Sequence, residues 1–458
     1  MILQTLFDPQ TIAVVGASDK DGKMGNLFVR HLADGYSGVI FPVHPETQNI
    51  CGLKAYQSIT DIPGQIDLLI PLIPSGQVPA LVEQCKAGKV KFLLASPSGF
   101  GEGPEGGKYL EAELLTLARE KHIRVVGPNS LGILNCVTRL NASMVPGLPP
   151  GCSGFSCVTQ SGGFGMAINM YTLDHQLEMA KFCDLGNSAD ITPCDLLDYF
   201  RHDADTCIVG AFLESFLAPE KFFDSARSLA AEKPVILTRL GRTAAGSRAS
   251  YAHLGISPGD VALEEWIQGS RIIPAQTGLE MLDIAKGLSW QPLPEGRKVG
   301  IITGAGGIGV ELTDLCLEHD LEVPEFSQQL QAALQPYLPN YTSVKNPVDL
   351  TPVWQDFPKM YPPLIRAFFN SAEVDILIIA ILDVAATVKP LMHAVSEAVT
   401  QARMDGCSFK PAYIYWAAPH GLRDHRQILQ KASIPCYQST LSTVRTVAAI
   451  CRYALQKK

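Results

Sequence analysis

The sequence predicts an α/β protein with a Rossmann-like domain at the N-terminus and two flavodoxin-like domains after it. Short apolar runs rich in Val and Ile recur along the 458 residues, and stretches with helical periodicity separate them. This alternation is typical of parallel sheets whose central strands are buried on both faces. Two segments rich in Pro and Gly, 145–153 and 290–296, interrupt it. They divide the chain into three predicted domains, 1–145, 152–290 and 297–458.

The apolar runs predict the strands of each domain in order. In the first domain we expect strands at 11–16, 39–43, 66–73, 90–96 and 123–126, with helices at 77–86 and 105–121. In the second we expect strands at 154–159, 179–184, 207–214 and 234–239, and a helix at 279–288. In the third we expect strands at 299–303, 374–381, 412–416 and 434–437, and a last helix at 441–455.

The second and third domains begin with similar motifs. Residues 158–167 read VTQSGGFGMA and residues 301–311 read IITGAGGIGVE, each combining a strand, a Gly-rich turn and a helix. The shared motif and the matching order of elements indicate two copies of one flavodoxin-like domain. The later segment KNPVDL, at 345–350, is interpreted as a turn with a polar anchor.

The composition narrows the classes of function. The net charge of −8 argues against a general nucleic-acid-binding protein. The N-terminus lacks the basic and apolar regions of a signal peptide, and no apolar run approaches the roughly 20 residues of a membrane span. The 12 cysteines include no CxxC pair and no Cys/His cluster at zinc spacing. We therefore expect a cytoplasmic protein with no metal site and no nucleic-acid or membrane partner.

The turn after the first strand reads Gly16-Ala17-Ser18 and precedes a helix. A helix N-terminus offers free N–H groups and the positive end of a dipole to a phosphate. An NAD site would show GxGxxG, and an acidic residue at the end of the second strand. That strand instead ends in Pro42-Val43-His44. The pattern favours a cofactor with a 3′-phosphorylated ribose, such as coenzyme A, over NAD; a turn used only for packing is the alternative.

Further turns follow strands at the edge where open α/β sheets bind ligands. The segments 74–76 and 96–100 would join the first turn in one rim. In the second domain, the turn Gln160-Ser161-Gly162-Gly163 opens a helix and would let an anion approach the backbone closely. Leu185-Gly186-Asn187 follows the next strand and would flank the same pocket. Each turn could also be a tight turn without a ligand.

His253 lies in a polar segment rich in Gly and Ser, and we expect it in an exposed, mobile loop. Such a histidine can accept and carry a phosphoryl group, although an ordinary surface histidine is the alternative. Glu214 ends a neighbouring strand. Its carboxylate could accept a hydrogen bond from the imidazole and determine which ring nitrogen is nucleophilic.

These motifs, in this order, resemble the α subunit of NDP-forming acyl-CoA synthetases, relatives of succinyl-CoA synthetase. The resemblance runs along nearly the whole chain. It rests on LFDPQTIAVVGAS at 6–18, IFPVHP at 40–45, SGF at 98–100, GPNSLGILN at 127–135, VTQSGG at 158–163, LGNSAD at 185–190, the strand ending at Glu214 and NPVDL at 346–350. It implies a CoA-binding domain followed by two succinyl-CoA-synthetase-type flavodoxin-like domains.

The resemblance also implies roles for individual residues. Those expected to bind CoA are Gly16, Ala17, Ser18, Lys23, Gly25, Pro42, Val43, His44, Pro74, Ser98, Gly99, Phe100 and Asn129. Those expected to bind phosphate or substrate are Gln160, Ser161, Gly162, Gly186 and Asn187. Phosphate would convert acyl-CoA to an acyl phosphate, His253 would take the phosphoryl group with Glu214 orienting it, and ADP would receive it. The acid is left open.

Two features depart from the family's pattern. The segment from Ala252 to Asp260 is about one residue shorter than usual and contains Pro258, which would stiffen a swinging loop. No ATP-grasp sequence follows the third domain, so the resemblance implies a separate ATP-grasp β subunit that binds ATP or ADP and Mg²⁺, in a heteromer or with a homodimer of this chain. The alternative function is a CoA-binding or acyl-CoA-binding sensor or scaffold without ligase turnover.

Overall fold

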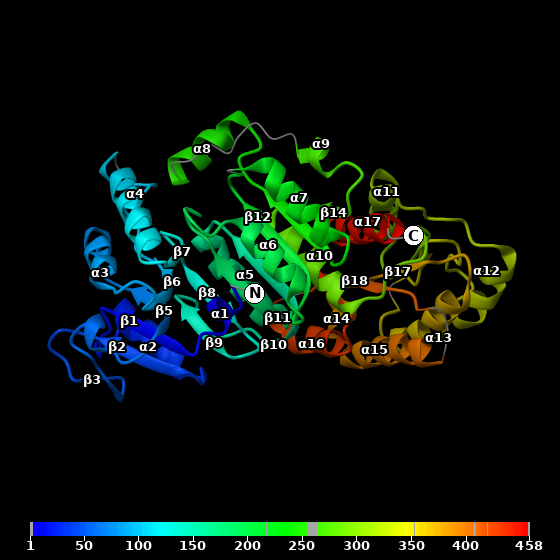
Figure 1. Ribbon diagram of the computed structural model, residues 1–458. Helices are drawn as coiled ribbons and strands as arrows, with labels where there is room; N and C mark the ends of the chain where they lie inside the picture. The colour runs from blue at the N-terminus through cyan, green and yellow to red at the C-terminus, as the bar shows by residue number, and fades with distance from the viewer. Residues whose placement is uncertain are drawn as a thin grey trace. The chain divides into compact units, whose positions relative to one another are not determined.

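The computed structural model describes residues 3–103, 105–216, 218–254, 263–351, 353–405, 409–418 and 420–456. The chain divides into two units, Met1–Gly278 and Leu279–Lys458, called here the first and second unit (Figure 1). The first unit contains two large sheets and the second contains one. The α/β fold with parallel sheets is confirmed, and the three domain boundaries drawn from the sequence stay a prediction.

The first sheet has five parallel strands in the order β2-β1-β5-β6-β7. Their bounds are β1 Thr11–Val15, β2 Val39–Val43, β5 Ile66–Pro71, β6 Val90–Leu94 and β7 Arg124–Val126. Helices α2 (Met24–Ala33), α3 (Val78–Gln84) and α4 (Glu105–Glu120) connect them. Because β1 pairs with β2 on one side and β5 on the other, the turn after β1 lies at the point where strand order reverses, the usual ligand position in such sheets.

The second sheet has seven strands in the order β14-β13-β12-β10-β11-β8-β9. Five are parallel: β10 Gly151–Thr159, β11 Met179–Asp184, β12 Thr206–Leu213, β13 Val235–Arg239 and β14 Ile272–Pro274. Its helices are α5 Gly162–His175, α6 Pro193–His202, α7 Pro219–Ala230, α8 Ala244–Leu254 and α9 Leu263–Ile267. Helices α6 and α7 pack side by side (Figure 1).

The apolar runs of the sequence predict no strand at 132–143, but the structure has an antiparallel hairpin there, β8 (Gly132–Asn135) and β9 (Leu140–Ser143). Strand β8 joins the second sheet by pairing with β11. All eight hairpin residues are buried, including Asn135 and Asn141, so the segment lacks the alternation that marks a surface strand. The amide of Asn135 donates to the carbonyl of Phe7, which compensates its burial.

The sheet of the second unit has the order β16-β15-β17-β18-β19. Its strands are β15 Val299–Thr303, β16 Val348–Asp349, β17 Ile376–Leu382, β18 Ala412–Ala417 and β19 Cys436–Tyr437. The longer helices are α10 Gly278–Trp290, α11 Gly306–Glu318, α13 Phe357–Asn370, α15 Lys389–Met404, α16 Arg423–Lys431 and α17 Thr440–Gln456.

This order repeats that of β11-β10-β12-β13-β14 in the first unit. The turns agree as well, because Thr159 Oγ1 accepts the N–H of Ser161 at 2.9 Å and Thr303 Oγ1 accepts that of Ala305 at 3.0 Å. The prediction of two flavodoxin-like copies is therefore confirmed. The polar anchor of the 345–350 segment is Asn346, whose side chain accepts the N–H of Ile301 and donates to the carbonyl of Val299.

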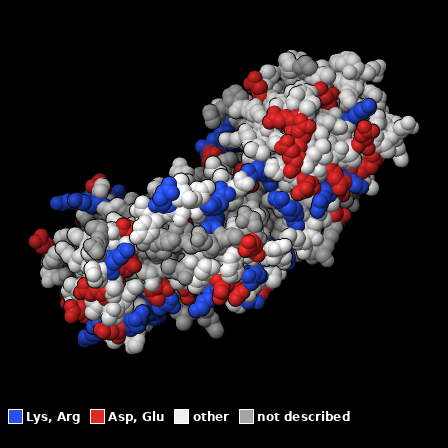
Figure 2. All heavy atoms as spheres, turned by 90° about the horizontal axis from the view of Figure 1, so that it is seen from above, with Lys and Arg blue, Asp and Glu red and all other residues white. Residues whose placement is uncertain are grey.

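The surface charge and the helices were compared with what nucleic-acid, membrane and metal binding would require. Cationic and anionic side chains are interspersed over the face drawn in Figure 2. Within the described ranges, no helix is long and apolar enough to cross a bilayer, and no group of three or more His, Cys, Asp and Glu side chains is placed to hold a metal ion.

Candidate functional site

A cavity of about 380 Å³ in the first unit collects residues from both of its large sheets. Ser96 follows β6 of the first sheet, Asn129 lies between β7 and β8, and the Gly-rich turn follows β10 of the second sheet. Its lining comprises Ser96, Asn129, Ser130, Leu131, Met144, Gln160, Gly162, Gly163, Met166 and His253. Residues predicted for CoA, for phosphate and for catalysis therefore meet here, at the carboxyl ends of the strands.

His253 and Glu214 are in direct contact. The ring Nδ1 of His253 lies 3.1 Å from Oε1 and 3.0 Å from Oε2 of Glu214. Glu214 directly follows β12 and is 5% exposed, whereas the His253 side chain is 53% exposed. Because a carboxylate only accepts, the contact favours a proton on Nδ1 and leaves the lone pair of Nε2 available to a phosphoryl group.

The expectation that His253 lies in a loop is wrong, because it occupies the last turn of helix α8. Thr243 begins this helix: its Oγ1 accepts the N–H of Gly246 at 3.0 Å and its carbonyl accepts that of Ser247 at 2.7 Å. The segment that follows contains several Ala residues, which favour helix over loop. The shortened spacing from Gly255 to Asp260 lies outside the described residues.

Helix α5 directs its N-terminus at the cavity. Its N-cap Ser161 makes no side-chain capping bond, and Gly162 and Gly163 line the cavity. A side chain built at Gly163 would meet no atom within 4 Å, so the space over the turn is open. Free N–H groups and the helix dipole at this position can stabilise an oxyanion beside His253.

Asp184, which sequence reasoning missed, lies beneath this turn. It ends β11, is fully buried, and accepts the N–H of Leu131 at 2.6 Å and that of Gly186 at 3.3 Å. Burial raises the pKa of the Asp184 carboxyl to about 7, against these hydrogen bonds, and the charge of Glu214 adds to the rise. An acidic residue at the end of a predicted strand, beside a Gly-rich turn, was a signal that could have identified it.

Replacing Asp184 with Asn is expected to change how stability depends on pH. A carboxyl whose folded pKa is raised stabilises the fold at low pH, and that contribution is lost as pH rises from about 4 through 7. The free energy of unfolding of the wild type should therefore fall over this pH range relative to that of Asp184→Asn. Any cost of the amide itself is the same at each pH and does not affect this difference. Denaturation midpoints at pH 5 and pH 8 measure this; equal pH dependence in the two proteins would contradict it.

The residues predicted for CoA gather at the carboxyl edge of the first sheet. Gly16 has φ +82°, and a Cβ there would stand 2.5 Å from the carbonyl oxygen of Leu72, so the turn requires glycine. A Cβ at Gly25 would stand 2.0 Å from the Gly16 carbonyl oxygen, which shows how closely α2 packs on the turn. The side chains of Ala17, Val43 and Phe100 are buried in the core, so only their backbone can face a ligand.

The remaining residues predicted to bind CoA also lie at the carboxyl edge of the first sheet, except Asn129. Pro42 and His44 lie at the end of β2, Lys23 is exposed at the start of α2, and Pro74 precedes a short 3-10 helix after β5. Ser18 caps its own turn by accepting the N–H of Lys20. Ser98 precedes Gly99 in the turn after β6, whereas Asn129 lies at the His253 cavity instead.

Glu102, which the sequence motifs did not identify, accepts hydrogen bonds from backbone N–H groups of the turn after β6. Its Oε1 accepts the N–H of Gly99 at 2.5 Å and its Oε2 accepts the amide of Asn187 at 2.6 Å. Asn187 donates to Glu111 as well, at 2.9 Å. A Cβ at Gly186 would stand 2.2 Å from the Pro128 carbonyl oxygen. Gly186 and Asn187 thus join the two sheets of the first unit and are not among the residues lining the cavity.

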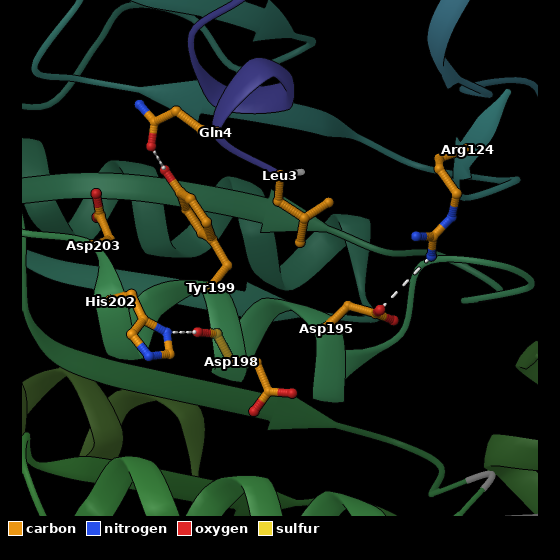
Figure 3. Close-up of a pocket in the computed structure, with 8 residues that line it drawn as sticks. All are labelled: Leu3, Gln4, Arg124, Asp195, Asp198, Tyr199, His202 and Asp203. Carbon is orange, nitrogen blue, oxygen red and sulfur yellow. Dashed lines mark hydrogen bonds and ion pairs between the residues drawn. The ribbon is translucent and has the colours of Figure 1, made fainter. Parts of the chain in front are cut away.

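A larger cavity of about 460 Å³ lies beside helix α6 (Figure 3). Several of its polar groups contact one another: Tyr199 donates to Gln4, Arg124 pairs with Asp195 at 3.7 Å, and His202 Nδ1 lies 2.9 Å from the Asp198 carbonyl. Asp203 is paired with Lys181. These contacts serve packing and helix capping, so the His253 cavity is the better candidate for chemistry.

Three family models match consecutive parts of the chain. A model described as a CoA binding domain matches residues 10–135. A succinyl-CoA ligase like flavodoxin domain matches 153–288, and a ligase-CoA domain matches 299–457.

Known proteins are similar over nearly the whole length. The α subunit of acetate–CoA ligase [ADP-forming] II of Pyrococcus furiosus is 31% identical over 439 residues, covering 95% of this chain and 94% of that protein. The α subunit of form I from the same organism is 30% identical over 464 residues, covering 100% and 99%. A dinucleotide forming acetyl-coenzyme A synthetase 1 of Candidatus Korarchaeum cryptofilum, solved with phosphate and ADP, gives a TM-score of 0.88 at 29% identity, covering 100% and 98%.

Proposed function

The chain belongs to the family of ADP-forming acetate–CoA ligase α subunits, which are acid–CoA ligases, and on this premise we propose how its residues perform the reaction. We propose that it interconverts acyl-CoA, phosphate and ADP with acid, CoA and ATP through an acyl phosphate and a phosphohistidine on His253. The observation that carries the proposal is the His253–Glu214 pair beside the uncapped N-terminus of α5, in one cavity. The alternative, a sensor without turnover, is not favoured by the comparisons.

In the first step, an oxygen of inorganic phosphate attacks the thioester carbonyl of acyl-CoA, the C–S bond breaks, and CoA leaves as thiolate. The N–H groups of Gly162 and Gly163 at the start of α5 support this step, because they offer donors to the phosphate oxygens. Ser96 and Asn129 come from the side of the cavity formed by the CoA-binding domain. They would contact the acyl end of the thioester.

In the second step, Nε2 of His253 attacks the phosphorus of the acyl phosphate, the P–O bond breaks, and the acid leaves as carboxylate. Glu214 holds the proton on Nδ1 and stabilises the positive charge that develops on the ring. Since 53% of the His253 side chain is exposed, a second protein can reach the phosphorylated ring. We propose that this protein is an ATP-grasp β subunit that binds ADP and Mg²⁺ and accepts the phosphoryl group.

The CoA site at the edge of the first sheet is tested by thermal shift. A ligand that binds only the folded state adds RT ln(1 + [L]/Kd), about 2.7 kcal/mol at a hundredfold excess over Kd. We expect CoA to raise the melting temperature, dephospho-CoA to raise it less, and NAD to leave it unchanged, because β2 ends without the carboxylate that ribose hydroxyls require. A larger shift with NAD than with CoA would overturn the proposal.

A further inference from the structure

Gln160, the residue after β10, has every polar position of its side chain occupied within the protein. Its Oε1 accepts the N–H of Glu214 at 2.9 Å and that of Ser215 at 3.0 Å. Its Nε2 donates to the hydroxyls of Ser188 at 3.0 Å and Ser215 at 3.2 Å. A carboxamide has two acceptor sites and two donors, so these four bonds satisfy it. The residue is 3% exposed, and no side-chain donor remains for the phosphate that the family resemblance implied as its ligand.

These bonds continue the sheet beyond its last backbone pair. The register of β10 and β12 ends at Thr159 opposite Phe212, and the N–H of Gln160 donates to the Phe212 carbonyl at 3.3 Å. Strand β10 ends here, and the side-chain oxygen of Gln160 accepts the backbone N–H groups of Glu214 and Ser215, the residues that follow β12. The backbone of Glu214 is therefore held by Gln160.

The position of the Glu214 carboxylate decides the geometry of His253. It approaches Nδ1 at 3.0 Å from a site that is 5% exposed. The hydroxyl of Ser250 also approaches it, at 3.4 Å. Since the carboxylate is attached to a backbone fixed by Gln160, release of that backbone would move the base partner of the imidazole.

We propose that Gln160 is a positioning residue, which acts through Glu214 to orient His253 for phosphoryl transfer and does not itself bind phosphate. This inference rests on the proposed function. A displacement of a reacting group by about 1 Å can cost about 10²-fold in rate. The loss should appear in the rate of transfer and leave the binding of the phosphoryl donor unchanged.

The substitution must keep the volume of the side chain. Gln160 lines both the His253 cavity and a second cavity of about 320 Å³ between the N-termini of α6 and α7. A shortened side chain would join the two cavities and confuse the result. Gln160→Met keeps the length and removes all four bonds, whereas Gln160→Glu keeps an acceptor for both backbone N–H groups.

The test measures phosphorylation of His253 by acetyl phosphate, a direct phosphoryl donor, in the full chain without a partner. We expect Gln160→Met to lower the maximum rate about 10²-fold and to change the half-saturating acetyl phosphate concentration less than twofold. Gln160→Glu should keep a higher rate than Gln160→Met. A tenfold rise in half-saturation at an unchanged maximum rate would make Gln160 a phosphate ligand, and unchanged kinetics would leave it only structural; either overturns the inference.

A matched control is Gln291 in the second unit, 6% exposed, which accepts the N–H of Ala412 at 2.8 Å and donates to the Ser433 carbonyl at 2.5 Å. Gln291→Met removes the same kind of buried clamp, so it should lower the melting temperature and leave the phosphorylation rate unchanged. An equal loss of rate in both variants would contradict the inference. If the wild type takes no phosphate from acetyl phosphate, the proposed function itself fails.

Discussion

Replacing His253 with alanine is expected to abolish phosphoryl transfer, with activity falling by at least about 10⁴-fold. The imidazole is the group that forms the covalent bond to phosphorus in the proposed reaction, so its removal leaves the acyl phosphate without the nucleophile that accepts the phosphoryl group. The measurement is the formation of ATP from acyl-CoA, phosphate and ADP by the chain together with its β subunit. Binding of CoA, measured by thermal shift, should be unchanged, because the residues predicted to bind CoA, Asn129 excepted, lie at the edge of the first sheet and not at the His253 cavity.

His202 provides the matched control for this substitution. It is also an exposed histidine at a cavity of the first unit, with Nδ1 2.9 Å from the Asp198 carbonyl (Figure 3). His202→Ala should retain full activity. Turnover by His253→Ala comparable to the wild type would show that phosphoryl transfer proceeds without His253 and would end the proposed mechanism.

Replacing Lys181 with methionine is expected to destabilise the first unit by about 3–5 kcal/mol. Lys181 lies in β11, is 1% exposed, and its Nζ lies 2.8 Å from carboxylate oxygens of Asp203 and Asp205. Removing the cation leaves Asp203, whose side chain is 5% exposed, as a buried charge without its ion pair. The loss in free energy of unfolding is measured by denaturant titration, with hydrogen exchange of the β11 amides reporting on the first unit.

The control for this prediction is an ion pair at the surface. Arg227 and Asp224 approach to 2.6 Å, but their side chains are 41% and 73% exposed. Water screens such a pair, so Arg227→Met should cost less than about 1 kcal/mol. A similar cost for the two substitutions would mean that burial does not set the energy of the Lys181 pair.

The strands of all three large sheets could be predicted to a great extent from apolar runs. Runs such as 66–71 and 376–381 are buried along their whole length, as central parallel strands require. The hairpin β8–β9 escaped because buried Asn135 and Asn141 interrupt its apolar pattern. The polar character of 241–253 suggested a loop, but its alanines and the Thr243 cap give helix α8.

The candidate site was predictable in part. Strand ends placed Glu214 and the Gly-rich turn at one edge, and the proximity of His253 to Glu214 followed from this and from the family resemblance. The contacts of Gln160, Asp184 and Glu102 could not be predicted, because they depend on the register between β10 and β12 and on the packing of two sheets. Sequence identifies a residue at a strand end, but it does not show which backbone groups that residue must satisfy.

The two copies of the internal repeat differ at the position of Gln160. Gly304 stands in the second copy where Gln160 stands in the first, after strands at the same position of their sheets. Glycine has no side chain to hold the end of the neighbouring strand β17. The two copies share the sheet, the threonine-bonded turn and the helix, and they differ at the residue that positions Glu214 in the first copy.

Phosphoryl transfer through His253 can be tested by locating the phosphate on the protein. The wild-type chain is incubated with acetyl phosphate, and the modified residue is identified by mass spectrometry under conditions that preserve acid-labile phosphoramidates. We expect one phosphoryl group per chain, on Nε2 of His253. A phosphoryl group on any other residue, or none on the folded, CoA-binding protein, would contradict it.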